Sequence, residues 1–224
     1  SVYKCLSNND GANSFNEPTT TATNTTIQTA DGYIWKYMYT LTDAEKRRFM
    51  TTKFMPVKTI AASDGSTQWT VQRDAIPGGI HVINVTDGGS NYYINDVVVS
   101  IAGDGKDANA YAILNTTSHM VDSIVVDDVG YGYTYAIVTL NSANGSGATA
   151  RAIMSPYGGH GKNAPEEFFS RTLMFYSNVS TDLNHGMVVN NDYRQLGIIK
   201  NPKKYQNIQR VTDLLGSACY VVEV

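Results

Sequence analysis

The side chains best suited to acid–base chemistry are four histidines, but their spacing indicates no catalytic site. His160 lies among glycines, and Ser155 or Ser170 with Asp182 or Glu167 would be its conceivable partners. The G-x-S-x-G turn that exposes a nucleophilic serine is absent from the sequence. The other three histidines form neither an H-x-x-x-H nor an H-E-x-x-H spacing. We therefore expect no enzyme, and a hydrolase that uses His160 is the least favoured class of function.

Acidic residues gather in two turns, where oxygen ligands for Ca²⁺ could converge. One turn carries Asp104 and Asp107, and the other carries Asp127 and Asp128. Neither turn has the spacing of the known twelve-residue calcium loop, and aspartate is common in turns because it hydrogen-bonds nearby backbone amides. The sequence predicts no metal site and leaves open whether either pair holds a cation.

One glycine-rich stretch, Gly145–Ala150, fits the G-x-G-x-x-A pattern of dinucleotide-binding turns. That pattern requires a helix after the glycines. Here an alternating, strand-like segment follows, so we expect no nucleotide and no other cofactor.

The composition excludes further classes of function. The 224 residues carry 17 basic and 20 acidic side chains, and the net charge of −3 gives no basic footprint for nucleic acid. No apolar run approaches the roughly 20 residues of a membrane-spanning helix. The two cysteines, Cys5 and Cys219, are predicted to be buried free thiols. We expect neither a nucleic-acid partner nor a membrane.

Short β-type runs separated by Gly, Asn, Asp and Ser predict a mainly β fold. Within it, the stretch Ile83–Tyr92 resembles Ile124–Tyr133, and Gly105–Ile113 resembles Gly145–Ile153, at offsets of 41 and 40 residues. Such a repeat predicts a separate all-β module. We expect a β-sandwich core domain formed by residues 1–68 and 156–224, interrupted by an inserted repeat domain at 69–155, with one or two short helices.

One helix is predicted in detail. Thr42 and Glu45 form a capping box, and the helix should end near Met50. In the preceding segment, Tyr33, Trp35, Tyr37 and Tyr39 share one face of a strand. A packed core is the favoured interpretation of this row, and a sugar-binding platform is the alternative.

Two separated segments carry a resemblance to a known family. Residues Asp31–Tyr39 read D-G-Y-I-W-K-Y-M-Y, and Arg194–Pro202 read R-Q-L-G-I-I-K-N-P; Val2–Leu6 and Glu17–Thr19 precede them in the same order. This order resembles the baseplate wedge subunit of T4-like contractile-tailed phages, the gene product eight family. The central repeat is not part of the shared pattern. The motif positions are Asp31, Gly32, Tyr33, Trp35, Tyr37, Gln195, Asn201 and Pro202.

The resemblance implies a non-enzymatic structural protein with a β-sandwich core, dimeric when full length and bound to other wedge proteins. It also implies a place in the virion, after assembly in the host cytoplasm. Because the sequence starts and ends in strand-like runs, we expect it to be a fragment of such a subunit. The basic side chains Arg47, Arg48 and Arg194 are the first candidates for interface anchors. The alternative is a glycan-binding adhesin or receptor-binding module of a phage tail.

Overall fold

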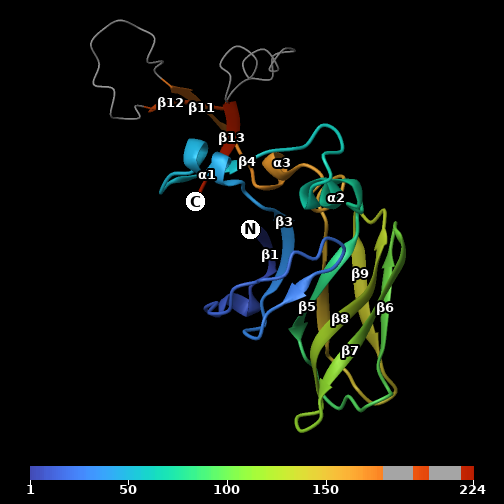
Figure 1. The fold of residues 1–224 in the computed structure, drawn as a ribbon. Helices are drawn as coiled ribbons and strands as arrows, with labels where there is room; N and C mark the ends of the chain where they lie inside the picture. Colours follow the sequence, from blue (N-terminus) through green and yellow to red (C-terminus); the bar gives the residue numbers. More distant parts are fainter. Residues whose placement is uncertain (179–193, 202–217) are drawn as a thin grey trace, which may run out of the picture. The chain divides into compact units, whose positions relative to one another are not determined.

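The computed structural model describes residues 1–178, 194–201 and 218–224, and the described chain is mainly β, as predicted (Figure 1). It forms two compact units. Unit 1 comprises Ser1–Tyr39 and Ala62–Lys162, and unit 2 comprises Thr40–Ala61 and Asn163–Val224. These boundaries differ from the expected ones after residues 68 and 155, because the first 39 residues group with the repeats. No helix in the described part of the chain is long and apolar enough to cross a membrane.

Unit 1 begins with a three-stranded antiparallel sheet in the order β1-β3-β2. Its strands are β1 (Val2–Ser7), β2 (Ile27–Gln28) and β3 (Ile34–Tyr39), and a short 3-10 turn, η1, spans Asn9–Gly11. Helix α2 (Thr67–Arg73) packs on β3, where Val71 joins Ile27 and Tyr37 in a small core. Helix α2 was not expected from the sequence, and with it the described chain has three short α-helices, against the one or two expected.

The repeats form a six-stranded antiparallel sheet that curls into a near-barrel. Its strands are β5 (Ile80–Asp87), β6 (Val98–Gly103), β7 (Lys106–Asn115), β8 (Met120–Tyr131), β9 (Ala136–Asn141) and β10 (Thr149–Met154). The order is β6-β9-β10-β5-β8-β7, and the two outermost strands, β6 and β7, are joined by only Asp104 and Gly105. The sheet therefore bends until its two edges approach one another.

The near-barrel has an approximate internal two-fold symmetry. Ala112 of β7 lies opposite Ile124 of β8, and Ala152 of β10 lies opposite Ile83 of β5. Exchanging the two repeats converts the first pair into the second. Alanines of β7 and β10 face the shared core, which is formed by the buried residues Ile80, Ile83, Tyr92, Ala110, Val121, Ile124, Tyr133 and Ala152.

One tyrosine of each repeat packs against a glycine of the other repeat. Tyr92 lies on Gly145, and Tyr133 lies on Gly105. A Cβ atom at either glycine would collide with the facing ring, so only glycine fits there. The two tyrosines are 2% and 6% exposed and close opposite parts of the core.

Unit 2 contains a four-stranded antiparallel sheet in the order β12-β11-β13-β4. Its strands are β4 (Phe54–Val57), β11 (Thr172–Asn178), β12 (Arg194–Lys200) and β13 (Ala218–Glu223). Helix α1 (Asp43–Phe49) packs on β4 and β11 through Phe49, which joins Met174 and Val221 in the core. A third helix, α3 (Ala164–Glu167), lies near β13.

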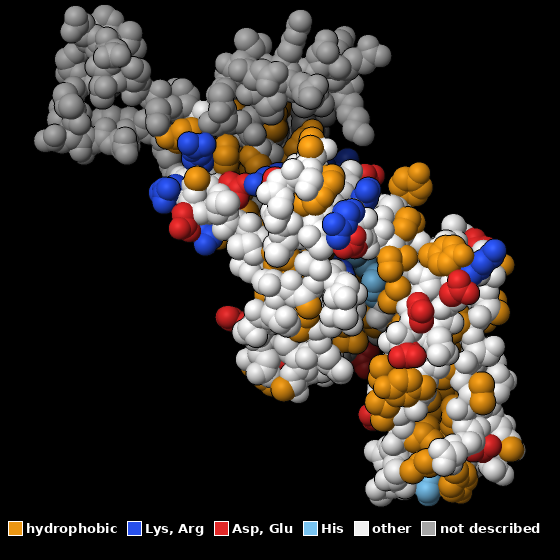
Figure 2. Space-filling model, turned by 45° about the vertical axis from the view of Figure 1, so that its right-hand side comes forward, with side chains coloured by type: hydrophobic (Ala, Val, Ile, Leu, Met, Phe, Trp, Pro, Cys, Tyr) orange, Lys and Arg blue, Asp and Glu red, His pale blue; other side chains and the backbone are white. Residues whose placement is uncertain are grey.

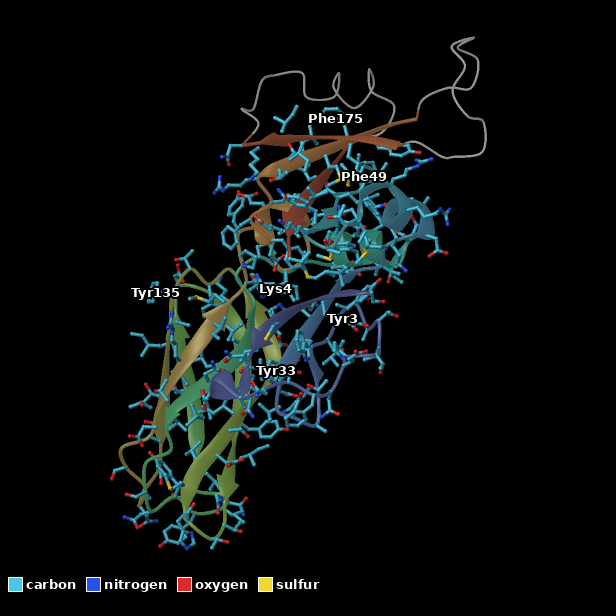
Figure 3. The ribbon with its side chains drawn as sticks, turned by 90° about the vertical axis from the view of Figure 1, so that its left-hand side faces the viewer. Tyr3, Lys4, Tyr33, Phe49, Tyr135 and Phe175 are labelled. Carbon is cyan, nitrogen blue, oxygen red and sulfur yellow. The ribbon has the colours of Figure 1, made fainter. Side chains whose placement is uncertain are left out.

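Helix α1 has the predicted ends. The Thr42 hydroxyl accepts a hydrogen bond from the Glu45 amide at 3.2 Å, and the Glu45 carboxylate accepts one from the Thr42 amide at 2.8 Å. Met50 is the C-cap. In the same unit the Phe175 ring covers Gly197 on the neighbouring strand, which explains why position 197 has no side chain (Figure 3 labels Phe49 and Phe175).

Candidate interaction surfaces

The Asp31 carboxylate organises the turn before β3. It accepts hydrogen bonds from the Thr29 hydroxyl (2.5 Å), the Ser14 hydroxyl (2.9 Å) and the amides of Phe15 (2.9 Å) and Asn16 (3.0 Å). These donors, the Thr29 hydroxyl above all, hold the pKa of Asp31 well below its usual range. Asp31 thereby fixes the loop that precedes β2 against the turn that begins β3.

The other motif residues around β3 also make local contacts. Gly32 has a φ of 82°, and the Tyr33 hydroxyl donates to the Ala12 carbonyl. Tyr33 and Trp35 are stacked with ring centroids 5.5 Å apart, and the Trp35 indole donates to the Thr29 hydroxyl at 3.3 Å. The motif therefore ties the N-terminal loop to β3 (Figure 3).

The aromatic row on β3 is divided. Tyr37 and Tyr39 are fully buried, and the Tyr37 hydroxyl lies 2.8 Å from that of Thr67 on α2. Tyr33 and Trp35 are only half-buried. The first pair is core, whereas the second pair leaves part of an aromatic surface in solvent.

The three candidate anchor arginines all belong to unit 2. Arg47 and Arg48 are exposed on α1, and the Arg48 guanidinium lies 6.0 Å from the centroid of the Tyr176 ring, a cation–π arrangement. Arg194 begins β12, the outermost strand beside β11. Its side chain and that of Gln195 lie outside the described residues.

The end of the second motif is described only in part. Asn201 has a φ of 49°, and its amide donates to the Arg171 carbonyl at 2.6 Å, which closes the connection at the end of β12. Pro202 lies outside the described residues, as do His185 and Asp182.

The serines considered as partners of His160 hold backbone groups. Ser155 donates to the Ile76 carbonyl and accepts from the Gly79 amide, both at 3.0 Å. Ser170, in unit 2, donates to the Val221 carbonyl at 2.7 Å. His160 is 4% exposed and packs against His81 with ring centroids 5.0 Å apart. The described contacts of both serines join backbone groups that are distant in the sequence, which is a structural role.

The aspartates considered as metal ligands also hold turns. Asp104 accepts from the Thr134 hydroxyl (2.5 Å) and from the amides of Thr134 (2.9 Å) and Tyr135 (3.2 Å), and these donors, the hydroxyl first, lower the pKa of Asp104 to about 2. Asp128 accepts from the Gly130 amide at 2.9 Å. Within residues 1–178, 194–201 and 218–224, no three His, Cys, Asp or Glu side chains form a group that could hold a metal ion.

The glycine pattern at residues 145–150 runs into strand β10, which begins at Thr149, and Gly145 lies against Tyr92 in the near-barrel. The segment bridges Ser90 through Ser146 and continues as a strand, so the helix that a dinucleotide site needs after the glycines does not follow it.

The outer surface of the near-barrel carries exposed apolar side chains and few positive charges. Residues 80–154 contain seven aspartates but only Lys106 and Arg151 as basic residues, and Figure 2 shows red more than blue over this region. The exposed apolar side chains of these strands and loops are Tyr93, Ile94, Val98, Tyr111, Ile113, Met120, Tyr131, Tyr135 and Ile137.

A pocket of about 210 Å³ lies where two loops of the near-barrel meet. Its lining residues are Tyr92, Tyr93, Ile94, Leu114, Thr116 and His119, and we call it the loop pocket. The Tyr93 and His119 rings lie 4.6 Å apart with an interplanar angle of 37°. Sequence reasoning missed this pocket; the only available signal was the apolar run Tyr92–Ile94 inside a predicted loop.

A larger groove of about 420 Å³ lies between the three-stranded sheet and strands β5 and β8 of the same unit. Its walls include Ser7, Gln28, Asn84 and Asp122. The Ser7 hydroxyl reaches the Asn84 side chain at 3.3 Å across it. The groove is therefore a polar seam inside unit 1.

Comparison with protein-family models, with curated proteins and with solved structures finds no match to this chain.

Proposed function

We propose that this chain is a structural component of a phage tail baseplate wedge and acts through protein–protein contacts. The observation that carries the proposal is the resemblance of two distant segments, Asp31–Tyr39 and Arg194–Pro202, to the wedge-subunit family. In that role the chain catalyses no reaction and requires no cofactor. Its partners are other wedge proteins and, in the full-length subunit, a second copy of itself, with no membrane or nucleic acid involved. Its location is the virion, after assembly in the host cytoplasm.

The contacts of the first motif support a scaffolding role. Asp31, Tyr33 and Trp35 hold a long polar loop in one conformation, and a preformed loop loses less entropy when a partner binds it. Exposed arginine and tyrosine support the same role, because these residues often dominate the binding energy of protein interfaces. Arg48, exposed on α1, lies over the half-buried ring of Tyr176 on β11 and combines these two residue types.

The test is co-expression of the full-length protein with the products of its neighbouring genes. We expect co-elution with at least one of them on size exclusion, and we expect R47E/R48E to weaken that complex. Lys46→Glu is the matched control on the same helix, because Lys46 contacts Asp43 at 3.6 Å in a largely exposed pair of small energetic weight. Failure to bind any neighbouring product would contradict the proposal.

The second candidate is a glycan-binding module of a phage tail. The half-buried Tyr33–Trp35 stack favours it, since aromatic faces in solvent can pack against sugar rings. Glycan-array binding that is lost in Trp35→Ala, with no complex formed with neighbouring products, would favour this function over the wedge.

A further inference from the structure

We propose that the loop pocket binds one apolar side chain of a partner protein, from a segment that carries lysine or arginine next to that side chain. The inference deepens the proposed function, on which it rests, by assigning a contact to the inserted repeat domain. That domain lies outside the pattern shared with the wedge family.

The pocket is a departure from the two-fold symmetry of the near-barrel. Five residues separate Tyr92 from the start of β6 at Val98, whereas only two separate the equivalent Tyr133 from the start of β9 at Ala136. The longer loop of the first repeat holds Tyr93 and Ile94, which are 45% and 66% exposed. Tyr92 and Tyr133 occupy equivalent, buried positions in the core of the near-barrel. Packing in that core does not explain the exposed apolar side chains of Tyr93 and Ile94.

The walls of the pocket are fixed by backbone hydrogen bonds. The Tyr92 amide donates to the His119 carbonyl at 2.9 Å, which joins the two loops, and the Asp96 amide donates to the Tyr93 carbonyl at 3.1 Å. The Asn115 side chain accepts from the amides of Thr117 and Ser118, both at 3.0 Å. A pocket held in this way needs little rearrangement to accept a ligand.

Three residues around the pocket adopt the left-handed backbone region. Asn91, Asn95 and His119 have φ values of 62°, 68° and 55°. Such conformations cost energy for residues other than glycine, and they are retained where the fold requires one loop shape. Here they place the Tyr93 and His119 rings beside one another.

The size and chemistry of the pocket indicate its occupant. A volume of about 210 Å³ fits a single large apolar side chain, and its walls are formed mainly by Tyr, Ile and Leu carbon atoms. The Tyr92 hydroxyl already lies 3.2 Å from the Ala148 amide, which donates to it. A sugar would need several polar partners for its hydroxyl groups, so an apolar anchor fits this pocket better.

The charge beside the pocket indicates what flanks that anchor. A second hollow, lined by Asp87, Met120 and Asp122, adjoins the Asn115–His119 turn. Asp96 follows Ile94 by two residues in the pocket loop; its carboxylate accepts from the Ser142 hydroxyl (2.7 Å) and the Ala143 amide (3.1 Å), and these bonds, the hydroxyl first, lower its pKa. The carboxylates of Asp87, Asp96 and Asp122 in the segments next to the pocket favour a partner with basic side chains beside the anchor.

The test follows backbone amide signals of the ¹⁵N-labelled chain during titration with acetylated, amidated Gly-Lys-Leu-Lys-Gly. We expect shifts at Tyr93, Ile94 and His119, with smaller shifts for the peptides Gly-Lys-Ser-Lys-Gly and Gly-Glu-Leu-Glu-Gly. Tyr93→Ala and Ile94→Asp should each weaken binding by about tenfold, the effect typical of an interface anchor. Tyr135→Ala, which removes a similarly exposed tyrosine from the corresponding loop of the second repeat, should leave binding unchanged.

The following results would overturn the inference: no shifts at these amides with the lysine–leucine peptide, equal shifts with all three peptides, or shifts only with methyl glycosides of galactose and N-acetylglucosamine. The last would assign the pocket to glycans. Failure here is separable from failure of the proposed function. If neighbouring gene products bind the Tyr93→Ala chain and the native chain equally, the wedge role stands and the pocket has no part in it.

Discussion

Ile83 of β5 lies directly opposite Ile124 of β8, and the two residues occupy the same position in their respective repeats. The symmetry of the near-barrel therefore relates this pair to itself, and both side chains are buried, at 4% and 7% exposure. The repeats meet at the point where one sequence position contacts its own counterpart.

Truncation of this pair should show coupling between the repeats. Ile83→Ala and Ile124→Ala should each lower the free energy of unfolding by about 2–5 kcal/mol, because each leaves a cavity in the shared core. The double variant should depart from additivity by about 0.5–3 kcal/mol, as expected for residues in contact. Urea unfolding measures all three. Ile137→Ala, at a position 62% exposed, is the control and should change stability by less than about 0.5 kcal/mol; strict additivity would contradict the expected coupling.

Gly145→Ala should destabilise unit 1, because the new methyl group would occupy space taken by the Tyr92 ring. Overpacking of this kind costs about 1–3 kcal/mol. Gly65→Ala is the control: Gly65 has a φ of 75° but open space around it, so only backbone strain of about 1 kcal/mol applies. Thermal unfolding compares the two variants, and a Gly145→Ala chain as stable as the native one would show that Tyr92 is not fixed there.

Asp31→Asn should destabilise the chain at neutral pH and much less in acid. The pKa of Asp31 is depressed in the folded state, chiefly by the Thr29 hydroxyl, so its stabilising effect is complete above its unfolded pKa of about 3.9. That effect is lost as the pH falls from there toward the folded pKa. Urea unfolding of the native and Asp31→Asn chains at several pH values between 7 and 2.5 measures this effect. The difference between their free energies of unfolding should shrink below about pH 4. Asp122→Asn, at an exposed position, is the control, and a difference constant with pH would contradict the expectation.

Trp35→Ala should lower the free energy of unfolding by less than Tyr37→Ala does. Tyr37 is fully buried, so its truncation should cost about 3–5 kcal/mol, whereas the half-buried Trp35 should cost about 1–3 kcal/mol through its stack on Tyr33. Denaturant unfolding distinguishes them. A cost below about 0.5 kcal/mol for Trp35→Ala would mean that the indole does not support the fold and would favour the glycan-binding function.

The two thiols should differ in reactivity. Burial, followed by the negative charge of Glu45, raises the pKa of Cys219 to about 11, so only about 0.1% of it is thiolate at pH 8. The expectation that both cysteines are buried is wrong: Cys5 is exposed and Cys219 is half-buried, although partial burial of the Cys5 thiol also raises its pKa. Iodoacetamide at pH 8 should therefore modify Cys5 first. Cys5→Ser should leave only the slow reaction, and equal rates for the two thiols would show that Cys219 is not protected.

Local signals predicted local structure well. The Thr42–Glu45 capping box gave the start of α1, and the repeat offsets located the near-barrel, because both depend on residues close in sequence or on internal similarity. Helix α2 was not predicted, since its inward face includes the polar residues Gln68 and Gln72 beside Val71. An apolar periodicity cannot reveal such a helix.

Features that depend on contacts between distant residues were not predictable from the sequence. Alternation placed Tyr33 and Trp35 on the same strand face as Tyr37, but only the packing of α2 shows which rings are covered. The loop pocket needs the turn at residues 115–119 to meet the loop at 92–94, and the repeats align without indicating that meeting. Its apolar side chains appeared in the sequence as ordinary loop residues.

The division of the chain between its units has a consequence for proteolysis. The chain passes from one unit to the other at residues 39–40, 61–62 and 162–163. One cut at any of these crossings leaves the two units joined by the remaining covalent connections, so their release as separate fragments would require all three to be cleaved. A protease would thus have to make three cuts before either unit could be lost from the chain.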